Sequence, residues 1–417
     1  MAGRLDAVYN GAAHGWACDD VPLLPKLVRI CVDGHEVCRS VASVFRQDLA
    51  DAGIRAGNAG FQAILPEKYR DGKPHRVEAF EIPNGRPLDG SPFVAVVPAL
   101  LEPYPFPTGL DFDADRPWLD ADDDVFNRDL PLHANSTDSG RHLKELRNDG
   151  YTVLEGVVPS RLIDAALSDV ERIWKEMPDV LVVSAAIPVP TLVSEVQQTP
   201  GFRASSFRYL DFHNVSEATA EIMCLPAIVE QVAAYLGGPV VSMQTLLFEN
   251  GTEQRAHQDF PYLHPPRPAF LAGVWVALED VHDDAGPLFY YRESHRRVPH
   301  FPFPQGSLFA LGGDGPHVRQ YEEFLAAQCQ EAGLSRLEFK PRKGDALIWH
   351  AGLVHGGSPR RNPALTRKSL VSHYTLRDSY ALDRRHPDRA PVVIERNNCT
   401  YHASQRPGHA ENRFALP

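Results

Sequence analysis

The feature that most restricts the fold of this 417-residue chain is a His-x-Asp pair followed, about a hundred residues later, by a His-Gly-Gly sequence. The pair is His257 and Asp259, and the later histidine is His355. Residues i and i+2 of a strand point the same way, so both side chains of the pair can reach one metal ion. A third ligand must then come from an opposite, sequence-distant strand, which a jelly roll supplies. Two histidines and one carboxylate are the facial triad that binds non-haem Fe(II) and leaves coordination positions open.

Two histidines are candidates for the third ligand. His350 ends an apolar run, residues 346–349, whereas His355 precedes Gly356 and Gly357, where small residues leave room for a co-substrate. We favour His355 and expect His350 to support the ligands or to lie in the core. The alternative for the pair itself is that His257 and Asp259 form a structural hydrogen bond.

An arginine shortly after His355 suggests what the co-substrate is. On an alternating strand Arg367, Ser369, Val371 and His373 share one face. An arginine that points into a barrel is costly to bury unless it meets a carboxylate, which its planar guanidinium can bind with two hydrogen bonds. This placement favours a keto-acid co-substrate. The alternative is a surface arginine beside Lys368.

Composition excludes several other classes of function. The net charge of −12 argues against a nucleic-acid partner, because phosphate backbones require clustered Lys and Arg. No apolar run approaches the ~20 residues of a membrane span. The six cysteines are scattered without a CxxC pair, which is typical of reduced thiols. With no signal-peptide pattern at the start, we expect a cytoplasmic protein.

The length suggests more than one domain. Residues 1–98 are predicted to form a small β-sandwich, with a hairpin over 27–43 that turns at Asp33-Gly34. Residues 99–142 are predicted to be an acidic, Pro-rich linker. Their aspartates do not form an EF-hand, because the glycine required at its sixth position is Arg116.

Residues 143–417 are predicted to form the catalytic domain. A helix should begin at Ser160 and run to about residue 175, and a second should span 226–235. The clearest strands are predicted at 241–249, 270–278, 287–291, 345–350 and 368–375. Helices followed by many short strands predict a mainly β fold with helices, a double-stranded β-helix (jelly roll).

Together, these residues resemble the phytanoyl-CoA dioxygenase (PhyH-like) family of Fe(II)/2-oxoglutarate-dependent oxygenases over roughly residues 143–385. The motifs that carry the resemblance are Gly150-Tyr151-Thr152-Val153-Leu154, His257-Gln258-Asp259, Trp275-Val276-Ala277-Leu278, Asp284-Ala285-Gly286-Pro287-Leu288, Gly344-Asp345-Ala346-Leu347-Ile348-Trp349-His350, His355-Gly356-Gly357 and Arg367-Lys368-Ser369. The first domain looks like a β-sandwich found beside bacterial glycosyltransferases, through Gly15-Trp16, Val32-Asp33-Gly34, Gly60-Phe61-Gln62 and 71–77.

The resemblance implies roles for individual residues. His257, Asp259 and His355 would hold the iron, and Arg367 would bind the far carboxylate of 2-oxoglutarate. Further co-substrate contacts are implied for Trp275, for Ser358, and for either Met243 or Gln244. A carboxylate at Asp259 also argues against a halogenase, since related halogenases replace it with a small residue so that chloride can bind the iron.

We therefore expect an oxygenase that uses Fe(II), 2-oxoglutarate and molecular oxygen, with ascorbate as an aid in vitro. Its expected reaction is hydroxylation of an unactivated C–H bond of a small molecule, with a saccharide-bearing substrate as one candidate and succinate and CO2 as co-products. Two alternatives are a non-oxidative cupin-type metalloenzyme and a carbohydrate-binding protein with a vestigial barrel. Substrate-pocket candidates are Tyr262, His264, the segment 207–213 and Arg292.

Overall fold

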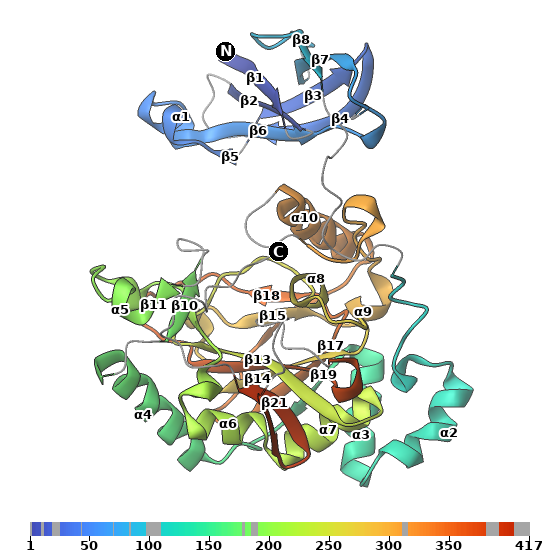
Figure 1. The fold of residues 1–417 in the computed structure, drawn as a ribbon, viewed down its shortest axis with the longest axis vertical. Coiled ribbons are helices and arrows are strands. Elements are labelled where there is room, and N and C mark those ends of the chain that lie inside the picture. Colours follow the sequence, from blue (N-terminus) through green and yellow to red (C-terminus); the bar gives the residue numbers. More distant parts are fainter. Residues whose placement is uncertain are drawn as a thin grey trace. The chain divides into compact units, whose positions relative to one another are not determined.

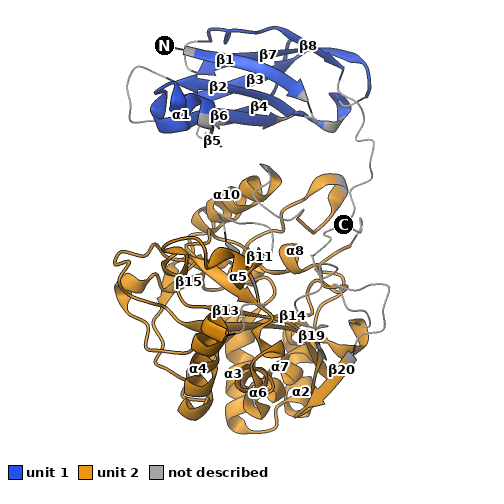
Figure 2. Ribbon diagram, turned by 60° about the vertical axis from the view of Figure 1, so that its left-hand side comes forward, with its two compact units in different colours: residues 1–105 blue, residues 106–417 orange. Residues whose placement is uncertain are grey.

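The structure, a computed structural model, forms two compact units, Met1–Pro105 and Phe106–Pro417 (Figure 2). The described residues are 2–9, 12–18, 26–42, 44–69, 71–82, 85–96, 110–176, 180–184, 191–310, 316–380 and 392–403. Among them no single helix is long and apolar enough to cross a membrane. One bent helix pair, Glu217–Met223 with Pro226–Leu236, meets the criteria of length and apolar composition for a membrane span.

The first unit contains two four-stranded sheets that enclose a small apolar core, as the sequence predicted (Figure 1). One sheet has the order β1 (Ala2–Tyr9), β2 (Ala12–Cys18), β6 (Asn58–Ile64), β5 (Val44–Phe45), and the other β4 (His35–Ala42), β3 (Lys26–Val32), β7 (Pro74–Ile82), β8 (Phe93–Val96). Short helical segments are α1 (Gln47–Asp51), η1 (Arg55–Gly57) and η2 (Glu67–Tyr69). Asp33 and Gly34 both have positive φ, at 50° and 81°, as a type I′ hairpin turn requires.

The segment expected to be a linker is partly folded into the second unit. Residues 99–109, its Pro-rich beginning, lie outside the described residues. Beyond them follow η3 (Trp118–Asp120), α2 (Asp123–His133) and α3 (Thr137–Asp149). Phe112, Leu119 and Phe126 are buried in the core of the second unit. The sequence did not predict this burial, because the three apolar residues are widely spaced among many acidic ones. Their burial stabilises the packing of the segment on the catalytic domain.

The second unit is built on a large sheet, with a smaller one opposite, as expected for a jelly roll. The large sheet has the order β11 (Thr191–Leu192), β10 (Leu181–Ser184), β12 (Phe207–Leu210), β13 (Val240–Phe248), β19 (Ser369–Leu376), β14 (Leu271–Ala277), β17 (Ala346–His350), β9 (Tyr151–Leu154), with β20 (Val392–Arg396) and β21 (Cys399–Ala403) joined beside β13. The small sheet has the order β16 (Arg336–Phe339), β15 (Leu288–Tyr291), β18 (His355–Gly357). The five predicted strands of this domain are all present, within one residue or so at each end.

Helices cover one face of the large sheet (Figure 1). The main ones are α3, α4 (Ser160–Glu176), α6 (Glu217–Met223) and α7 (Pro226–Leu236). As the periodicity of its sequence predicted, α4 buries Leu162, Ile163, Ala166, Val170 and Ile173. The remaining elements are α5 (Val193–Val196), η4 (Phe202–Ala204), η5 (Phe212–Asn214), α8 (Phe260–Leu263), η6 (Asp283–Ala285), α9 (Ser294–Arg297), η7 (Pro304–Gly306), α10 (Pro316–Glu331) and η8 (Arg377–Ser379).

Alternation along the central strands separates this helix-covered core from the barrel interior. In β14, Val274 and Val276 pack toward the helices. Trp275 belongs to a second cluster, which also contains Phe339 of the small sheet. Residues on that face of β14 therefore point into the space between the sheets, where the predicted site lies.

Candidate active site

His257 and His355 are direct backbone partners at β18, a strand of the small sheet. The His257 N–H donates to the His355 carbonyl at 2.8 Å, and the His355 N–H donates back at 2.9 Å. Asp259 lies just beyond, at the start of α8. His257 is 6% exposed, His355 5% and Asp259 8%. Their ligand atoms lie within 4.8 Å of one another. The chain thus brings together the three residues that the sequence singled out.

The local backbone differs from the strand expected for the His-x-Asp pair. His257 makes an isolated bridge to His355, and Asp259 has the helical dihedrals φ −80° and ψ −37°. Pro261 in the first turn of α8 favours this helical start. Gln258 has no sheet partner, and its N–H donates to the Tyr321 hydroxyl at 2.7 Å, which donates to the Gln258 carbonyl at 3.1 Å. The helical turn at Asp259 and the hydrogen bonds from Tyr321 of α10 therefore orient the His-x-Asp pair, and not the alternation of a β-strand.

Hydrogen bonds fix which atoms of the triad face a metal. His257 Nδ1 bonds the Arg255 carbonyl at 2.8 Å and His355 Nδ1 bonds the Leu353 carbonyl at 3.0 Å. Since carbonyls only accept, both Nδ1 atoms carry a proton, which leaves each Nε2 as the atom that can bind a metal. Each Nε2 lies 3.6 Å from Asp259 Oδ1. Two imidazole nitrogens and one carboxylate oxygen form the donor set that binds Fe(II).

The charges are those that metal binding needs. Burial lowers the pKa of His257 to about 3, so this imidazole is neutral at physiological pH. Burial alone would raise the pKa of Asp259, but His355 and His373 beside it hold that pKa well below its usual range. An ionised Asp259 beside a neutral His257 can ligate a cation without either group losing a proton first.

The second oxygen of Asp259 is held by residues of the large sheet. Oδ2 accepts from Trp349 Nε1 at 2.8 Å and from His373 Nε2 at 3.2 Å. Gln244 Nε2 lies 3.2 Å from the other nitrogen of His373 and can donate to it. Gln244, which we expected to contact the co-substrate, is thus hydrogen-bonded to the residue that supports Asp259.

Gly273 makes room for this arrangement. A Cβ added at Gly273 would lie 2.1 Å from the Trp349 ring, so the indole occupies the space that a side chain would fill. Only glycine at this position lets the indole lie flat enough to reach Asp259.

Arg367 is a buried cation with no anionic partner among the described residues. It is 3% exposed, its Nη1 donates to the Gly286 carbonyl at 3.1 Å, and its Nε has no partner. Burial lowers the pKa of its guanidinium to about 10. Trp275 lies beside it, with the ring centre 5.7 Å from the guanidinium carbon, and the indole Nε1 is also unpartnered. Unpaired donors of this kind, buried near a metal site, fit a bound carboxylate.

Comparison with known proteins agrees with this geometry. Residues 146–369, more than half of the chain, match the phytanoyl-CoA dioxygenase (PhyH) family. The chain belongs to this family. It is therefore a non-haem Fe(II)/2-oxoglutarate-dependent oxygenase, with His257, Asp259 and His355 as the facial triad of the family.

The individual proteins that the chain resembles include some with low sequence identity. Human peroxisomal phytanoyl-CoA dioxygenase is 22% identical over 251 residues, which cover 58% of this chain and 69% of the human protein. Among solved structures, the epimerase SnoN from nogalamycin biosynthesis is 18% identical, with a TM-score of 0.40, over 57% of this chain and 83% of SnoN. EctD from S. alaskensis, with 2-oxoglutarate and 5-hydroxyectoine, is 19% identical, with a TM-score of 0.43, over 66% of this chain and 88% of EctD.

Ser358, another predicted co-substrate contact, has partners of its own. Its hydroxyl accepts from Arg336 at 2.6 Å and donates to Glu338 at 2.8 Å. A role for Ser358 in binding the PhyH co-substrate would require it to exchange one of these bonds, and the assignment stays a prediction. Arg292, a candidate for the substrate pocket, is exposed and bonded to Asp149 at 2.9 Å.

His350 lies outside the triad. Its Nε2 bonds Asp120 at 2.9 Å, and its Nδ1 accepts from the Gly352 N–H at 3.0 Å, so both ring nitrogens are engaged. Burial alone would raise the pKa of Asp120, but His350 holds it below its usual value. This pair could not be predicted from the sequence, because Asp120 lies in an acidic run 230 positions away from His350.

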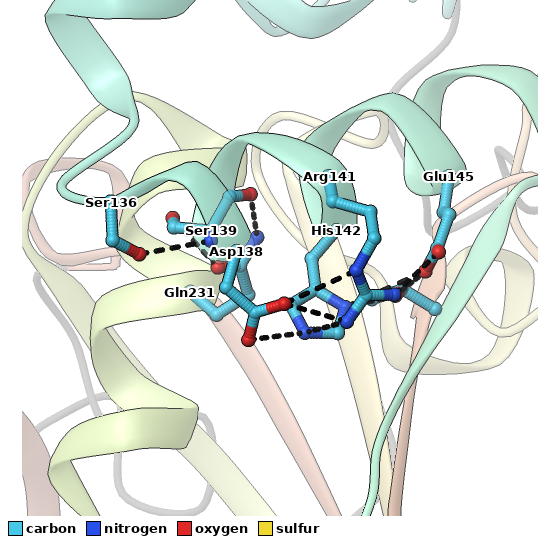
Figure 3. A network of polar contacts seen from close by, with 8 residues as sticks. Ser136, Asp138, Ser139, Arg141, His142, Glu145 and Gln231 are labelled. Atoms are coloured by element: carbon cyan, nitrogen blue, oxygen red, sulfur yellow. Dashed lines mark hydrogen bonds and ion pairs between the residues drawn. The ribbon is translucent and has the colours of Figure 1, made fainter.

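A polar cleft of about 770 Å³ lies elsewhere, lined by α3, β9 and α7 and containing no triad residue (Figure 3). Arg141 bonds Asp138 at 2.8 Å and Glu145 at 2.6 Å, and the Ser139 hydroxyl donates to Gln231 at 2.9 Å. Because the side chains labelled in Figure 3 satisfy one another, the network offers nothing comparable to Arg367.

Proposed function

We propose that this oxygenase hydroxylates an unactivated C–H bond of a small molecule, coupled to conversion of 2-oxoglutarate into succinate and CO2. The observation that carries the proposal is the combination of a buried triad with Arg367, a buried guanidinium that has no anionic partner among the described residues. A barrel without activity would not be expected to have both a complete set of metal ligands and a buried cation without an anionic partner, because burying such a cation is costly. A non-oxidative metalloenzyme would not need the cation.

The residues fit the groups that the family implies. The donor set is two imidazole nitrogens and a carboxylate, and the Nε of Arg367, which has no partner, can donate to a carboxylate. When bound, Fe(II) and 2-oxoglutarate together activate molecular oxygen for the oxidation. The chain's own work is positioning. His257, Asp259 and His355 would hold the iron, and Arg367 would orient the co-substrate and keep water from its far carboxylate.

A saccharide-bearing substrate is the narrower form of this proposal. Its support is the set of motifs in the first domain, which resemble sandwiches found beside glycosyltransferases and occur here on two small sheets. Succinate release measured with a panel of sugars, glycosides and their aglycones distinguishes a saccharide-bearing substrate from other small molecules. Succinate release stimulated by glycosides but not by aglycones is expected, and the reverse order would contradict the saccharide assignment.

The general proposal is tested by succinate formation from 2-oxoglutarate with and without Fe(II), in the wild type and Asp259→Ala. We expect iron-dependent turnover in the wild type, and neither tight iron binding nor turnover in the variant, whose thermal unfolding should remain cooperative. Isotopically labelled oxygen distinguishes hydroxylation from desaturation, since only the former leaves a labelled atom in the product. Wild-type-like turnover by Asp259→Ala would falsify the triad assignment.

A further inference from the structure

A second unpaired arginine lies on the face of the large sheet that carries the site. Arg208 is the second residue of β12, and its neighbours Phe207 and Tyr209 pack into the helix-covered core. Alternation therefore turns Arg208 to the barrel side. Its partner across the ladder is Phe248 of β13, which belongs to the barrel-interior cluster with Trp275.

Arg208 lies near the metal ligand His257. The Tyr262 ring stands edge-on to the His257 ring, with centroids 5.8 Å apart. Arg208 is close enough to interact electrostatically with His257 and with Tyr262. The guanidinium, the phenol and the iron ligand thus occupy one region of the barrel.

Arg208 makes no hydrogen bond or ion pair with any described residue. It is only partly exposed, and burial lowers its pKa. By contrast, Arg203, five positions earlier, is paired with carboxylates, because it donates hydrogen bonds to both Glu171 and Glu249. A partly buried guanidinium without such a partner is costly, and a bound oxyanion would offset that cost.

The co-substrate does not account for this charge. 2-Oxoglutarate has two carboxylates, and the proposed function assigns one to the iron and the other to Arg367. Arg208 lies on β12, and β13 separates it from β19, which begins two residues after Arg367. Two strand spacings are about 10 Å, so the two arginines have room for separate ligands.

We infer that Arg208 binds an oxyanion of the substrate, a carboxylate or a phosphate, and thereby positions the substrate beside His257. The inference rests on the proposed function and specifies its substrate class as an anionic small molecule. A guanidinium fork binds either oxyanion with two parallel hydrogen bonds, which fixes orientation as well as position. Tyr262 would border the same region of the pocket.

Calorimetry tests this without knowledge of the substrate. The anaerobic enzyme loaded with Fe(II) and 2-oxoglutarate is titrated with propionate, inorganic phosphate or neutral propionamide. The proteins are the wild type, Arg208→Gln, Arg208→Lys and, as a surface control, Arg161→Gln, whose side chain is 72% exposed. We expect the wild type and the control to bind at least one anion, and Arg208→Gln to weaken that binding about tenfold or more. Arg208→Lys should lose less.

Each outcome decides the inference. Preference for propionate or for phosphate identifies the oxyanion, and no binding of propionamide is expected. Equal anion binding by the wild type and Arg208→Gln, or none by the wild type, overturns the inference. A loss of 2-oxoglutarate affinity in Arg208→Gln as the main effect overturns it too, since the arginine would then belong to the co-substrate. Failure of the proposed function is a separate signal, namely no iron-dependent succinate from the wild type.

Discussion

Replacing Arg367 with methionine should have opposite effects on the stability of the empty protein and on co-substrate binding. Burial lowers the pKa of Arg367 from its ordinary value to about 10, which corresponds to an unfavourable ~3 kcal/mol for the charged form in the fold. Methionine keeps much of the apolar stem but loses the bond to the Gly286 carbonyl, worth about 1 kcal/mol. The metal-free, co-substrate-free variant should therefore be more stable than the wild type by about 1–2 kcal/mol.

The same variant should bind 2-oxoglutarate about 30- to 1000-fold more weakly, from the loss of ~2–4 kcal/mol of charge-assisted hydrogen bonding. Thermal unfolding with and without Fe(II) and 2-oxoglutarate, under anaerobic conditions, measures both effects. The stability gain should shrink above pH 10, because the wild-type guanidinium then loses its proton in the fold while it stays charged when unfolded.

Arg203→Met is the matched control for Arg367→Met. Arg203 is paired with Glu249, which is 7% exposed, so its removal leaves a buried carboxylate with fewer partners and should destabilise the protein by about 1–3 kcal/mol. The reasoning fails if Arg367→Met lowers the unfolding temperature of the empty protein and still binds 2-oxoglutarate normally. In that case the arginine would be a structural residue, and the anchor of the co-substrate would lie elsewhere.

Three further predictions concern the metal ligands and their surroundings. Gly273→Ala should displace the Trp349 indole and reduce Fe(II) affinity about tenfold or more, measured by anaerobic metal titration, and normal affinity would show that the indole is dispensable. His355→Ala should lose tight iron binding, whereas His350→Ala should keep it and lower the unfolding temperature; a reversed result would make His350 the ligand. His295 has its pKa lowered to about 3 by burial, so stability should fall as pH drops below 6.5, by about 1.4 kcal/mol per pH unit. His295→Gln should flatten that decline in urea unfolding between pH 7 and pH 5, and an unchanged slope would contradict it.

The sequence predicted best those features that depend on local pattern. Alternation placed the barrel strands, a helical stripe placed α4, and Asp33-Gly34 placed the hairpin turn. The triad could be predicted because three ligand types at characteristic spacing are informative even without the fold. These features depend on few residues, which act through short-range geometry.

What the sequence could not predict are pairs that only the folded chain brings together. Tyr321 fixes the backbone of Gln258 from 63 positions away, and Asp120 bonds His350 from 230 positions away. Neither pair has a period or a motif, because each depends on how whole elements pack. His373 was the exception, since alternation already placed it on the face of Arg367.

The two kinds of polar group in this barrel show where ligands are needed. The triad atoms that face away from the metal position are all bonded: each Nδ1 to a carbonyl, and the outer oxygen of Asp259 to Trp349 and His373. Arg367 and Arg208, by contrast, have no anionic partner among the residues that the structure describes. Two partly or fully buried cations are costly to the fold unless anionic ligands pair with them. The geometry therefore points to two anionic ligands beside one metal.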